Sequence, residues 1–414
     1  MRKRVVVTGL GVVAPNGIGK EAFWETIRTG KSAVKKITRF DASSYPSQIA
    51  AEVSGFDPAD FMDPKIARRS DASTQFFLAS AKMAVEDSGL NFQKENREMI
   101  GVFEGTSLGS LNWCLNQEDI LIEKGFRRMN PLTVIGGMTG AAAGYASLEY
   151  RLNGPSLTFC TGSAAASKAI GYAFRAIASG EISISLAGGS EYPIVPAIFA
   201  SFCLAKSTST NNQFPGKACK PFDKNRDGLV LGEGGAVLIL EELTHAVSRD
   251  AKIYAEIIGF GTTCDAYHIT SPEVGGGQIA RAIRLALEEA RIKPEDVDYV
   301  NAHGTGTLVN DKVETAAFKR AFGAHAYKIP ISSTKPVTGH LLGASGAVEM
   351  VVSVLALQNQ FVPPTINYGV PDPDCDLDYV PNNGKSSELK VILSSNYSFG
   401  GKNSILLIKN FLGT

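Results

Sequence analysis

The sequence repeats a pattern of predicted strands and helices, and this internal duplication constrains the fold more than any other feature. The corresponding segments are 5–13 with 254–263, 84–90 with 286–292, 99–106 with 297–305, 154–171 with 331–352, and 183–190 with 390–396. Each half therefore reads strand, helix, strand, helix, strand. The strands are continuous apolar runs, which is typical of strands buried on both faces of a sheet.

Strands that alternate with helices predict an α/β fold, with sheets rich in parallel strands and right-handed crossovers. Two such halves packed together predict a sandwich of five layers in the order α-β-α-β-α. We expect the boundary near 243–251, which gives an N-terminal half at 1–250 and a C-terminal half at 251–414 around one shared core. The segment 197–228 contains Gly and Pro at intervals, and we expect it to form loops over the site.

Composition excludes several classes of function. The 41 basic and 41 acidic residues balance, so no binding to nucleic acid or to an anionic membrane surface is expected. The six cysteines form no CxxC pair and have no metal-ligand spacing, so we expect reduced thiols, no metal and a cytoplasmic protein. Gly9 and Gly11 interrupt the N-terminal apolar run too early for a signal peptide, and we identify no apolar stretch of the ~18 residues that a membrane helix needs.

Ser163 lies where an apolar strand turns into a helix of small residues. This is the setting of a nucleophile elbow, because the free N–H groups and the dipole at a helix N-terminus favour negative charge. Cys160, three residues earlier, is expected to be a buried, inert thiol inside the strand.

Two of the five histidines occur in loops rich in Gly and Thr, which are His303 in 301–307 and His340 in 335–346. A histidine satisfied in a tight turn is the alternative interpretation of His303. Against that alternative, the glycines around His303 allow a ligand to approach the backbone closely, and Thr305 and Thr307 offer it hydroxyl groups. No role is assigned to the remaining three histidines, which are expected in loops or facing solvent: His245, His268 and His325.

Two other motifs are rejected. Gly9-Leu-Gly11 follows a predicted strand as a dinucleotide-binding loop would, but Pro15-Asn16-Gly17 leaves no helix facing it. The segment 223–228 is similar to the start of a calcium-binding loop. However, Gly234 occupies position twelve of that loop, where a bidentate Glu is required.

These motifs together resemble the β-ketoacyl-ACP synthases of the thiolase superfamily, most closely the type II elongating enzymes. The resemblance extends from Arg4 to Asn403 and implies the thiolase fold. The nucleophilic cysteine of the family falls on position 163, which is serine here, whereas both catalytic histidines remain as His303 and His340. The resemblance also implies further site residues, namely Lys335 and Glu349 as supports of the histidine loops, Thr305 and Thr307 as contacts to the phosphopantetheine arm, and Phe399 with Gly400 at the substrate gate.

Two further points concern the gate and the partner. Simple core packing is the alternative interpretation of Phe399, and the preceding Asn396-Tyr397-Ser398 departs from the usual Ser-Phe-Gly. Five basic residues match positions through which relatives dock an acyl carrier protein (ACP), although solvated surface charge is an equal alternative: Lys65, Arg68, Arg69, Arg127 and Arg128.

The serine points to decarboxylation rather than condensation. A cysteine thiol has a pKa near ~8.5 that a helix N-terminus can lower, but a serine hydroxyl lies several units higher, and a dipole effect of roughly 1 kcal/mol cannot close that gap. Decarboxylation of malonyl-ACP to acetyl-ACP needs no nucleophile and no cofactor beyond the phosphopantetheine of the ACP. Stand-alone ketosynthase-like decarboxylases with serine at this position occur in polyketide β-branching cassettes, where they supply an HMG-CoA-synthase-like partner. The resemblance also implies a homodimer.

Three alternatives remain open at this stage. Ser163 could itself act as the nucleophile of a condensing or acyl-transferring enzyme. The chain could be a non-catalytic chain-length-factor subunit paired with an active ketosynthase. It could also bind ACP without any catalysis.

Overall fold

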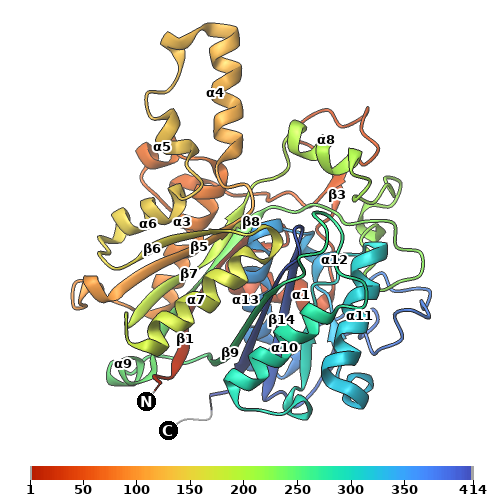
Figure 1. Cartoon of the computed structure of the whole chain (residues 1–414). Coiled ribbons are helices and arrows are strands. Elements are labelled where there is room, and N and C mark those ends of the chain that lie inside the picture. The colour runs from red at the N-terminus through yellow and green to blue at the C-terminus, as the bar shows by residue number, and fades with distance from the viewer. Residues whose placement is uncertain (1, 412–414) are drawn as a thin grey trace.

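The computed structural model describes residues 2–411, and its two halves repeat one arrangement of strands and helices (Figure 1). The elements of the first half are β1 (Val5–Ala14), β2 (Gly17–Ile18), α1 (Lys20–Thr29), β3 (Lys35–Lys36), β4 (Ile49–Ala50), α2 (Pro64–Ala67), α3 (Ala72–Ser88), β5 (Ile100–Thr106), α4 (Leu111–Lys124), α5 (Thr133–Gly137), α6 (Ala141–Tyr150), β6 (Ser156–Cys160), α7 (Ala165–Ser179), β7 (Ile184–Glu191), α8 (Pro196–Leu204), β8 (Gly234–Glu242) and α9 (Leu243–Ser248). Those of the second half are β9 (Ala255–Cys264), α10 (Gly277–Ala290), β10 (Tyr299–Asn301), α11 (Leu308–Phe322), β11 (Ile331–Ser332), α12 (Lys335–Thr338), α13 (Ser345–Asn359), β12 (Phe361–Val362), β13 (Lys385–Ser386), β14 (Val391–Ser398) and β15 (Lys402–Lys409).

The main strands follow one another in the order β11-β10-β14-β15-β9-β1-β8-β7-β5-β6. The five strands of each half are therefore contiguous, and the halves join where Val5–Val7 of β1 pair antiparallel with Ala255–Ile257 of β9. The predicted duplication and the α/β class are confirmed.

The prediction of sheets rich in parallel strands is only half right. In the first half, β5 pairs parallel with β6 and β7, but β8 pairs antiparallel with β7 and β1. In the second half, β10 pairs parallel with β11 and β14, but β15 pairs antiparallel with β14 and β9. The alternating pattern omitted β8 and β15, and each pairs antiparallel with the strand that precedes it in the chain. The turn between β14 and β15 is short, whereas the segment between β7 and β8 is long and includes α8.

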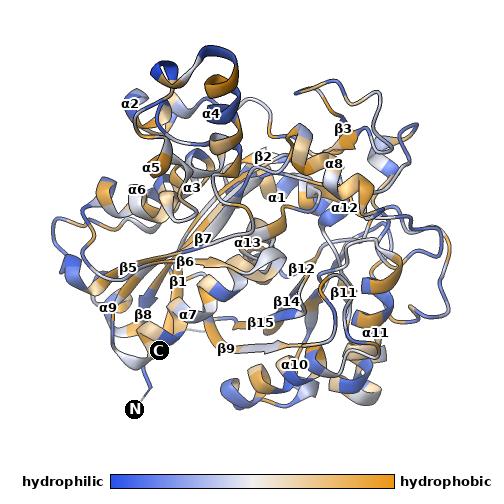
Figure 2. Ribbon diagram, turned by 45° about the horizontal axis from the view of Figure 1, so that its top comes forward, coloured by the Kyte–Doolittle hydropathy of each residue, from blue (hydrophilic) through white to orange (hydrophobic). Residues whose placement is uncertain are grey.

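Helices cover both faces of each half and meet in the middle of the molecule. Helices α7 and α13 lie between the two sets of strands, α3 and α6 pack on the outer face of the first, and α10 and α11 on that of the second (Figure 1). The largest cluster of buried side chains combines residues of both halves, such as Leu238, Ile170, Val351 and Ile392. Figure 2 shows hydrophobic colour along the strands of the first half, whereas the outer helices α10 and α11 carry hydrophobic and hydrophilic colour together.

One segment, Leu342–Asn359, is long and apolar enough to cross a membrane, contrary to the sequence-based expectation, but 89% of it is buried inside the protein. It comprises α13 and the turn before it. A helix that is hydrophobic on every side is expected in a core of this size.

Three local expectations are corrected by the structure. The loops expected at 197–228 include helix α8, and the following residues Val230 and Gly232 exchange backbone hydrogen bonds with His340. Strand β6 is the outermost strand of its half, so it is not buried on both faces, and Leu157 is 47% exposed. Cys160, expected to be buried in this strand, is exposed for the same reason.

Candidate active site

Ser163 lies in a single helical turn, Gly162–Ala164, between the end of β6 and the start of α7. The chain turns sharply here because Gly162 has a φ of +63°, a conformation that L side chains rarely adopt. The turn directs the Ser163 hydroxyl toward the loop that follows α12, where its Oγ lies 3.0 Å from Nε2 of His340.

His340 is held through its ring and through its backbone. Its Nδ1 lies 2.9 Å from the hydroxyl of Ser345, at the start of α13, and its backbone N–H donates to the carbonyl of Val230 at 2.7 Å. The preceding Gly339 has a φ of +73°, and a Cβ on it would come within 3.0 Å of the Gly232 backbone. Only glycine therefore lets the loop carry His340 this close to the strand end that supports it.

His303 follows β10 and is fixed by a buried lysine. The Nζ of Lys335 donates to the carbonyl oxygen of His303 at 2.5 Å and lies 3.3 Å from Nδ1 of the same residue. A lysine ammonium can only donate, so Nδ1 must accept and the ring hydrogen is placed on Nε2. Lys335 also donates to Oε1 of Glu349 at 2.5 Å, and the amide of Asn396 donates to Oε2 of Glu349 at 2.6 Å.

The electrostatics of the site favour neutral imidazoles. Burial lowers the pKa of His303 well below its ordinary value, and the charge of Lys335 lowers it further. Burial also lowers the pKa of His340, again with a contribution from Lys335. Burial raises the pKa of the Glu349 carboxyl, and the ammonium of Lys335 opposes this rise. The planes of the two imidazole rings are nearly perpendicular, at 83°, and their centroids are 5.3 Å apart.

The structure thus brings together five residues that the sequence analysis singled out for catalysis: Ser163, His303, Lys335, His340 and Glu349. It also reveals supports that the sequence analysis missed. Both oxygens of Glu314, on α11, accept backbone N–H groups at 2.8 Å, one from His303 and one from Gly304. The only sequence signal for Glu314 was an acidic residue on the apolar side of a helix, directly after the histidine loop.

The remaining predicted substrate contacts lie in two loops, one after β10 and one between β14 and β15. The hydroxyls of Thr305 and Thr307 lie 2.9 Å apart. Phe399 is 50% exposed, so the alternative of simple core packing does not apply to it. Gly400 follows in a left-handed conformation and donates its N–H to the carbonyl of Ile269.

The five predicted docking cations lie at the surface in two segments. Lys65, Arg68 and Arg69 belong to α2 and the residues after it, and Arg127 and Arg128 belong to the turn that follows α4. All five are exposed, and within residues 2–411 none forms an ion pair with a carboxylate. Their charges are therefore available to a partner.

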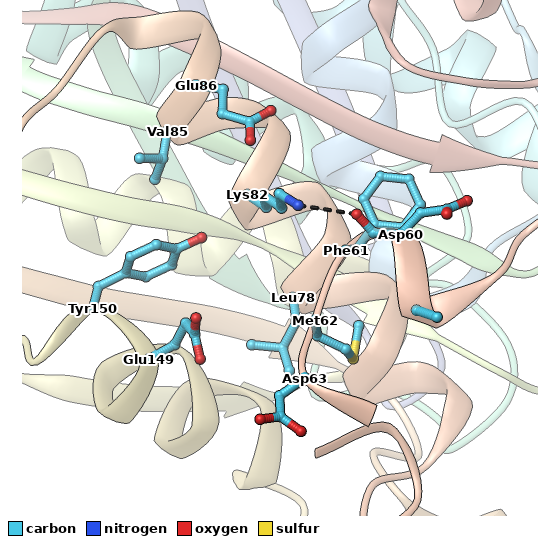
Figure 3. Close-up of a pocket in the computed structure, with 11 residues that line it drawn as sticks. Asp60, Phe61, Met62, Asp63, Leu78, Lys82, Val85, Glu86, Glu149 and Tyr150 are labelled. Atoms are coloured by element: carbon cyan, nitrogen blue, oxygen red, sulfur yellow. Dashed lines mark hydrogen bonds between the residues drawn. The ribbon is translucent and has the colours of Figure 1, made fainter. Parts of the chain in front are cut away.

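A pocket of about 490 Å³ lies between the Pro58–Asp60 turn, α3 and α6 (Figure 3). Its rim carries four carboxylates, from Asp60, Asp63, Glu86 and Glu149, and Lys82 donates to the backbone carbonyl of Asp60. None of the predicted catalytic or substrate-binding residues lines it, so it is not part of the candidate active site.

The other histidines are engaged elsewhere. His245 bridges Glu241 and Glu95, at 2.7 and 2.9 Å, and is half-buried on α9 rather than in a loop. His325 lies 3.2 Å from the carbonyl of Val297, and His268 is exposed in a loop.

Comparison with known proteins shows the family of the chain. Residues 2–246 match the model of the β-ketoacyl synthase N-terminal domain, and residues 254–369 match that of the C-terminal domain. The chain belongs to the β-ketoacyl synthase family.

Relatives in this family are similar over the whole chain. The 3-oxoacyl-(acyl-carrier-protein) synthase 2 of Coxiella burnetii is 45% identical over 407 residues, which cover 98% of each chain. A putative polyketide β-ketoacyl synthase 1 of Streptomyces cyaneus is also 45% identical, over 99% of this chain and 98% of its own.

Solved structures of β-ketoacyl synthases show the same fold. The ishigamide ketosynthase/chain length factor superposes with a TM-score of 0.92 at 34% identity, over 99% of this chain and 100% of the other. A chain from the structure of a type II polyketide synthase acyl carrier protein in complex with its ketosynthase bound to the hexaketide matches with a TM-score of 0.90 at 35% identity, over 99% of this chain and 100% of its own. The predicted thiolase-type ketosynthase fold is thereby confirmed.

Proposed function

We propose that this β-ketoacyl synthase homologue decarboxylates malonyl-ACP to acetyl-ACP. The observation that carries the proposal is a pair of buried imidazoles, whose pKa values are lowered by burial, beside a serine. Within residues 2–411, the imidazole that faces this serine contacts no carboxylate. The bond between C2 and the carboxylate of the malonyl group breaks, and its electron pair moves onto the thioester oxygen as an enolate. Carbon dioxide leaves, and C2 then takes up a proton to give acetyl-ACP.

The two histidines have the geometry to hold that enolate oxygen. Nε2 of His303 carries the hydrogen because Lys335 faces Nδ1. His340 can present its Nε2–H in the same way when the Ser345 hydroxyl donates to Nδ1. A preorganised donor of this kind is worth about 3 kcal/mol in the transition state, and the walls of the buried site exclude competing water.

A second candidate function is acyl transfer through Ser163, and one observation favours it. The distance of 3.0 Å from its Oγ to Nε2 of His340 is within reach for a general base. However, the other nitrogen of His340 contacts the hydroxyl of Ser345 and not a carboxylate. In serine hydrolases a buried carboxylate orients this imidazole and stabilises the imidazolium, and its loss costs ~10⁴-fold in rate. Burial and the charge of Lys335 oppose the imidazolium further.

Substitutions at position 163 distinguish the two candidates. If the serine is a remnant of a nucleophile position, Ser163→Ala retains acetyl-ACP formation within a few-fold of the wild type. Wild-type protein incubated with acyl-ACP gains no mass. Ser163→Cys places a thiol at a helix N-terminus, where its pKa falls, so this variant becomes alkylatable by iodoacetamide. Intact-protein mass spectrometry measures both adducts, and mass spectrometry of the ACP measures turnover.

The opposite pattern identifies the serine as a nucleophile. Loss of activity in Ser163→Ala, together with an acylated peptide containing Ser163 in the wild type, would replace decarboxylation by acyl transfer. A non-catalytic chain-length-factor subunit or an inert ACP-binding module would release no carbon dioxide. The retention of both histidines in the geometry above argues against these two possibilities.

We also propose that an acyl carrier protein delivers the substrate to the basic segments on α2 and after α4. The related ketosynthase structure in complex with its acyl carrier protein supports such a partner. The five exposed cations supply charge complementary to an acidic carrier, and such contacts mainly steer a transient encounter. Thr305 and Thr307 would then contact the phosphopantetheine arm on its way to the histidines.

Charge reversal tests this docking site. Arg127→Glu combined with Arg128→Glu is expected to raise the KM for malonyl-ACP by roughly 10-fold or more, because two attractions become two repulsions. The KM for malonyl-pantetheine should stay unchanged, since this substrate lacks the carrier. Lys94→Glu with Lys328→Glu is the matched control, because both residues are exposed and the change of net charge is identical. An equal effect of the two pairs would exclude Arg127 and Arg128 from the docking site.

Two further features belong to the proposal. The outer edge of β6 is unpaired within residues 2–411, and exposed apolar side chains lie on the neighbouring α4, α5 and α6, namely Leu121, Ile122, Val134, Ile135 and Leu148. A free edge beside an apolar surface supports a symmetric homodimer through β6.

The resemblance to stand-alone decarboxylases supports a cytoplasmic enzyme whose acetyl-ACP serves an HMG-CoA-synthase-like partner in a polyketide β-branching cassette.

A further inference from the structure

The hydroxyl of Ser398 occupies the position directly in front of the backbone N–H of Ser163. Ser398 is the last residue of β14, and its Oγ accepts this N–H at 3.1 Å. The same hydroxyl lies 3.2 Å from the carbonyl oxygen of Phe399, to which it donates its hydrogen. A Cβ on Gly162 would lie 1.9 Å from Oγ of Ser398, so the serine side chain fills the space against the backbone of the turn.

This N–H is the group that acyl transfer at position 163 would use. When a nucleophile on that side chain attacks a thioester, the carbonyl oxygen becomes an oxyanion, and the nucleophile's own backbone N–H is one of its hydrogen-bond donors in serine proteases. Loss of one such donor costs about 100-fold or more in rate. In this chain the donor already has an acceptor, so an incoming carbonyl oxygen must displace the Ser398 hydroxyl to reach it.

Ser398 does not contact the donors that we assign to the enolate oxygen. Within residues 2–411, it forms no hydrogen bond with His303 or His340. Nε2 of His340 faces the Ser163 hydroxyl at 3.0 Å, so an enolate oxygen there displaces Ser163 and not Ser398. The Ser398 hydroxyl can therefore block one reaction and leave the other free.

We propose that Ser398 is a specificity-determining residue that occupies the oxyanion position at residue 163 and so prevents acyl loading there. This inference rests on the proposed function, because it explains why the site carries out decarboxylation alone. It predicts that replacing the serine at position 163 by cysteine restores a nucleophile without restoring full loading. Both obstacles must be removed together.

The test compares two variants that carry the same thiol. Ser163→Cys alone and Ser163→Cys with Ser398→Gly are incubated with hexanoyl-pantetheine. The thiolate attacks the thioester carbonyl, a new carbon–sulfur bond forms, and the pantetheine thiolate leaves and takes up a proton. We expect the double variant to acylate at least ~10-fold faster, which is part of the ~100-fold effect of one oxyanion donor. Intact-protein mass spectrometry over time gives the rates.

A second readout separates the oxyanion effect from a general loosening of the site. Alkylation by iodoacetamide displaces iodide at a saturated carbon, so it forms no oxyanion, but it depends on the access and ionisation of the same thiol. We expect the alkylation rate and its pH profile to be the same in both variants. Ser163→Cys with Ser398→Ala removes only the hydroxyl and should reproduce the faster acylation. The matched control is Ser163→Cys with Ser404→Ala, which removes a buried hydroxyl that has no hydrogen-bond partner in the described chain and should acylate like Ser163→Cys alone.

Each outcome decides the inference. Equal acylation rates with and without the Ser398 hydroxyl, or acylation and alkylation rising together, would overturn it. Failure of the wild type to release carbon dioxide from malonyl-ACP would overturn the proposed function instead, and the comparison of acylation rates would still report on Ser398.

Discussion

His303→Ala and His340→Ala are each expected to reduce the formation of acetyl-ACP by at least ~100-fold, the typical effect of removing one oxyanion donor. Each substitution removes one of the two N–H groups that we assign to the enolate oxygen. A conservative replacement should recover part of the loss, because His303→Gln keeps an N–H donor at the end of the side chain. Turnover is measured by mass spectrometry of the ACP, with malonyl-ACP in excess.

Two controls separate a loss of chemistry from a loss of structure. His268→Ala removes an exposed loop histidine and should leave turnover unchanged. The melting temperatures of the active-site variants should stay close to that of the wild type, because removing either imidazole leaves no unpaired buried charge. Near-normal turnover in both His303→Ala and His340→Ala would refute the enolate mechanism.

The residues alone singled out Ser163, His303 and His340, whereas their catalytic roles, and Lys335 and Glu349 as supports, came from the family resemblance. The folded chain brings the three loops together because corresponding strands of a duplicated fold end at equivalent positions. Ser163 follows β6, and His340 follows the matching strand β11 of the other half, so the duplication itself brings their loops together. His303 follows β10, the neighbour of β11 in the sheet. The pattern of strands and the small number of histidines pointed to these loops, and the resemblance supplied the expected roles.

Other features depend on three-dimensional contacts that no local pattern contains. The edge position of β6 follows from the strand order, and an edge strand can be as apolar as a central one when a further surface covers it. In the sequence, nothing distinguishes Glu314 from other acidic helix residues. Only the folded structure shows that its carboxylate accepts the backbone N–H groups of His303 and Gly304. Ser398 was visible in the sequence as a departure from the family pattern, but its effect depends on a contact between residues 235 positions apart.

The buried ion pair between Lys335 and Glu349 provides the largest expected effect on stability. The side chains are 1% and 4% exposed, and Nζ and Oε1 are 2.5 Å apart. Lys335→Met leaves the Glu349 carboxylate buried without its cation, and breaking a buried pair in this way typically costs about 3–5 kcal/mol. At an unfolding entropy of roughly 2.1 cal/mol/K per residue, a chain of this length that unfolds as one unit should lose about 3–6 °C in melting temperature.

The same substitution should affect activity through His303. Without the ammonium, Nδ1 of His303 has no donor facing it, so the ring hydrogen is no longer confined to Nε2 and the enolate oxygen loses a preorganised partner. Lys335 is in this sense a positioning residue, and Lys335→Met is expected to lower kcat more than it raises KM.

A second substitution distinguishes the two effects of Lys335. Adding Glu349→Gln to Lys335→Met removes the unpaired carboxylate, so it should recover part of the lost melting temperature. It cannot recover kcat, because the group that fixes the tautomer of His303 is still missing. Recovery of stability and turnover together would mean that Lys335 acts only through folding. An unchanged melting temperature in Lys335→Met would contradict the role of the ion pair in the core of the site.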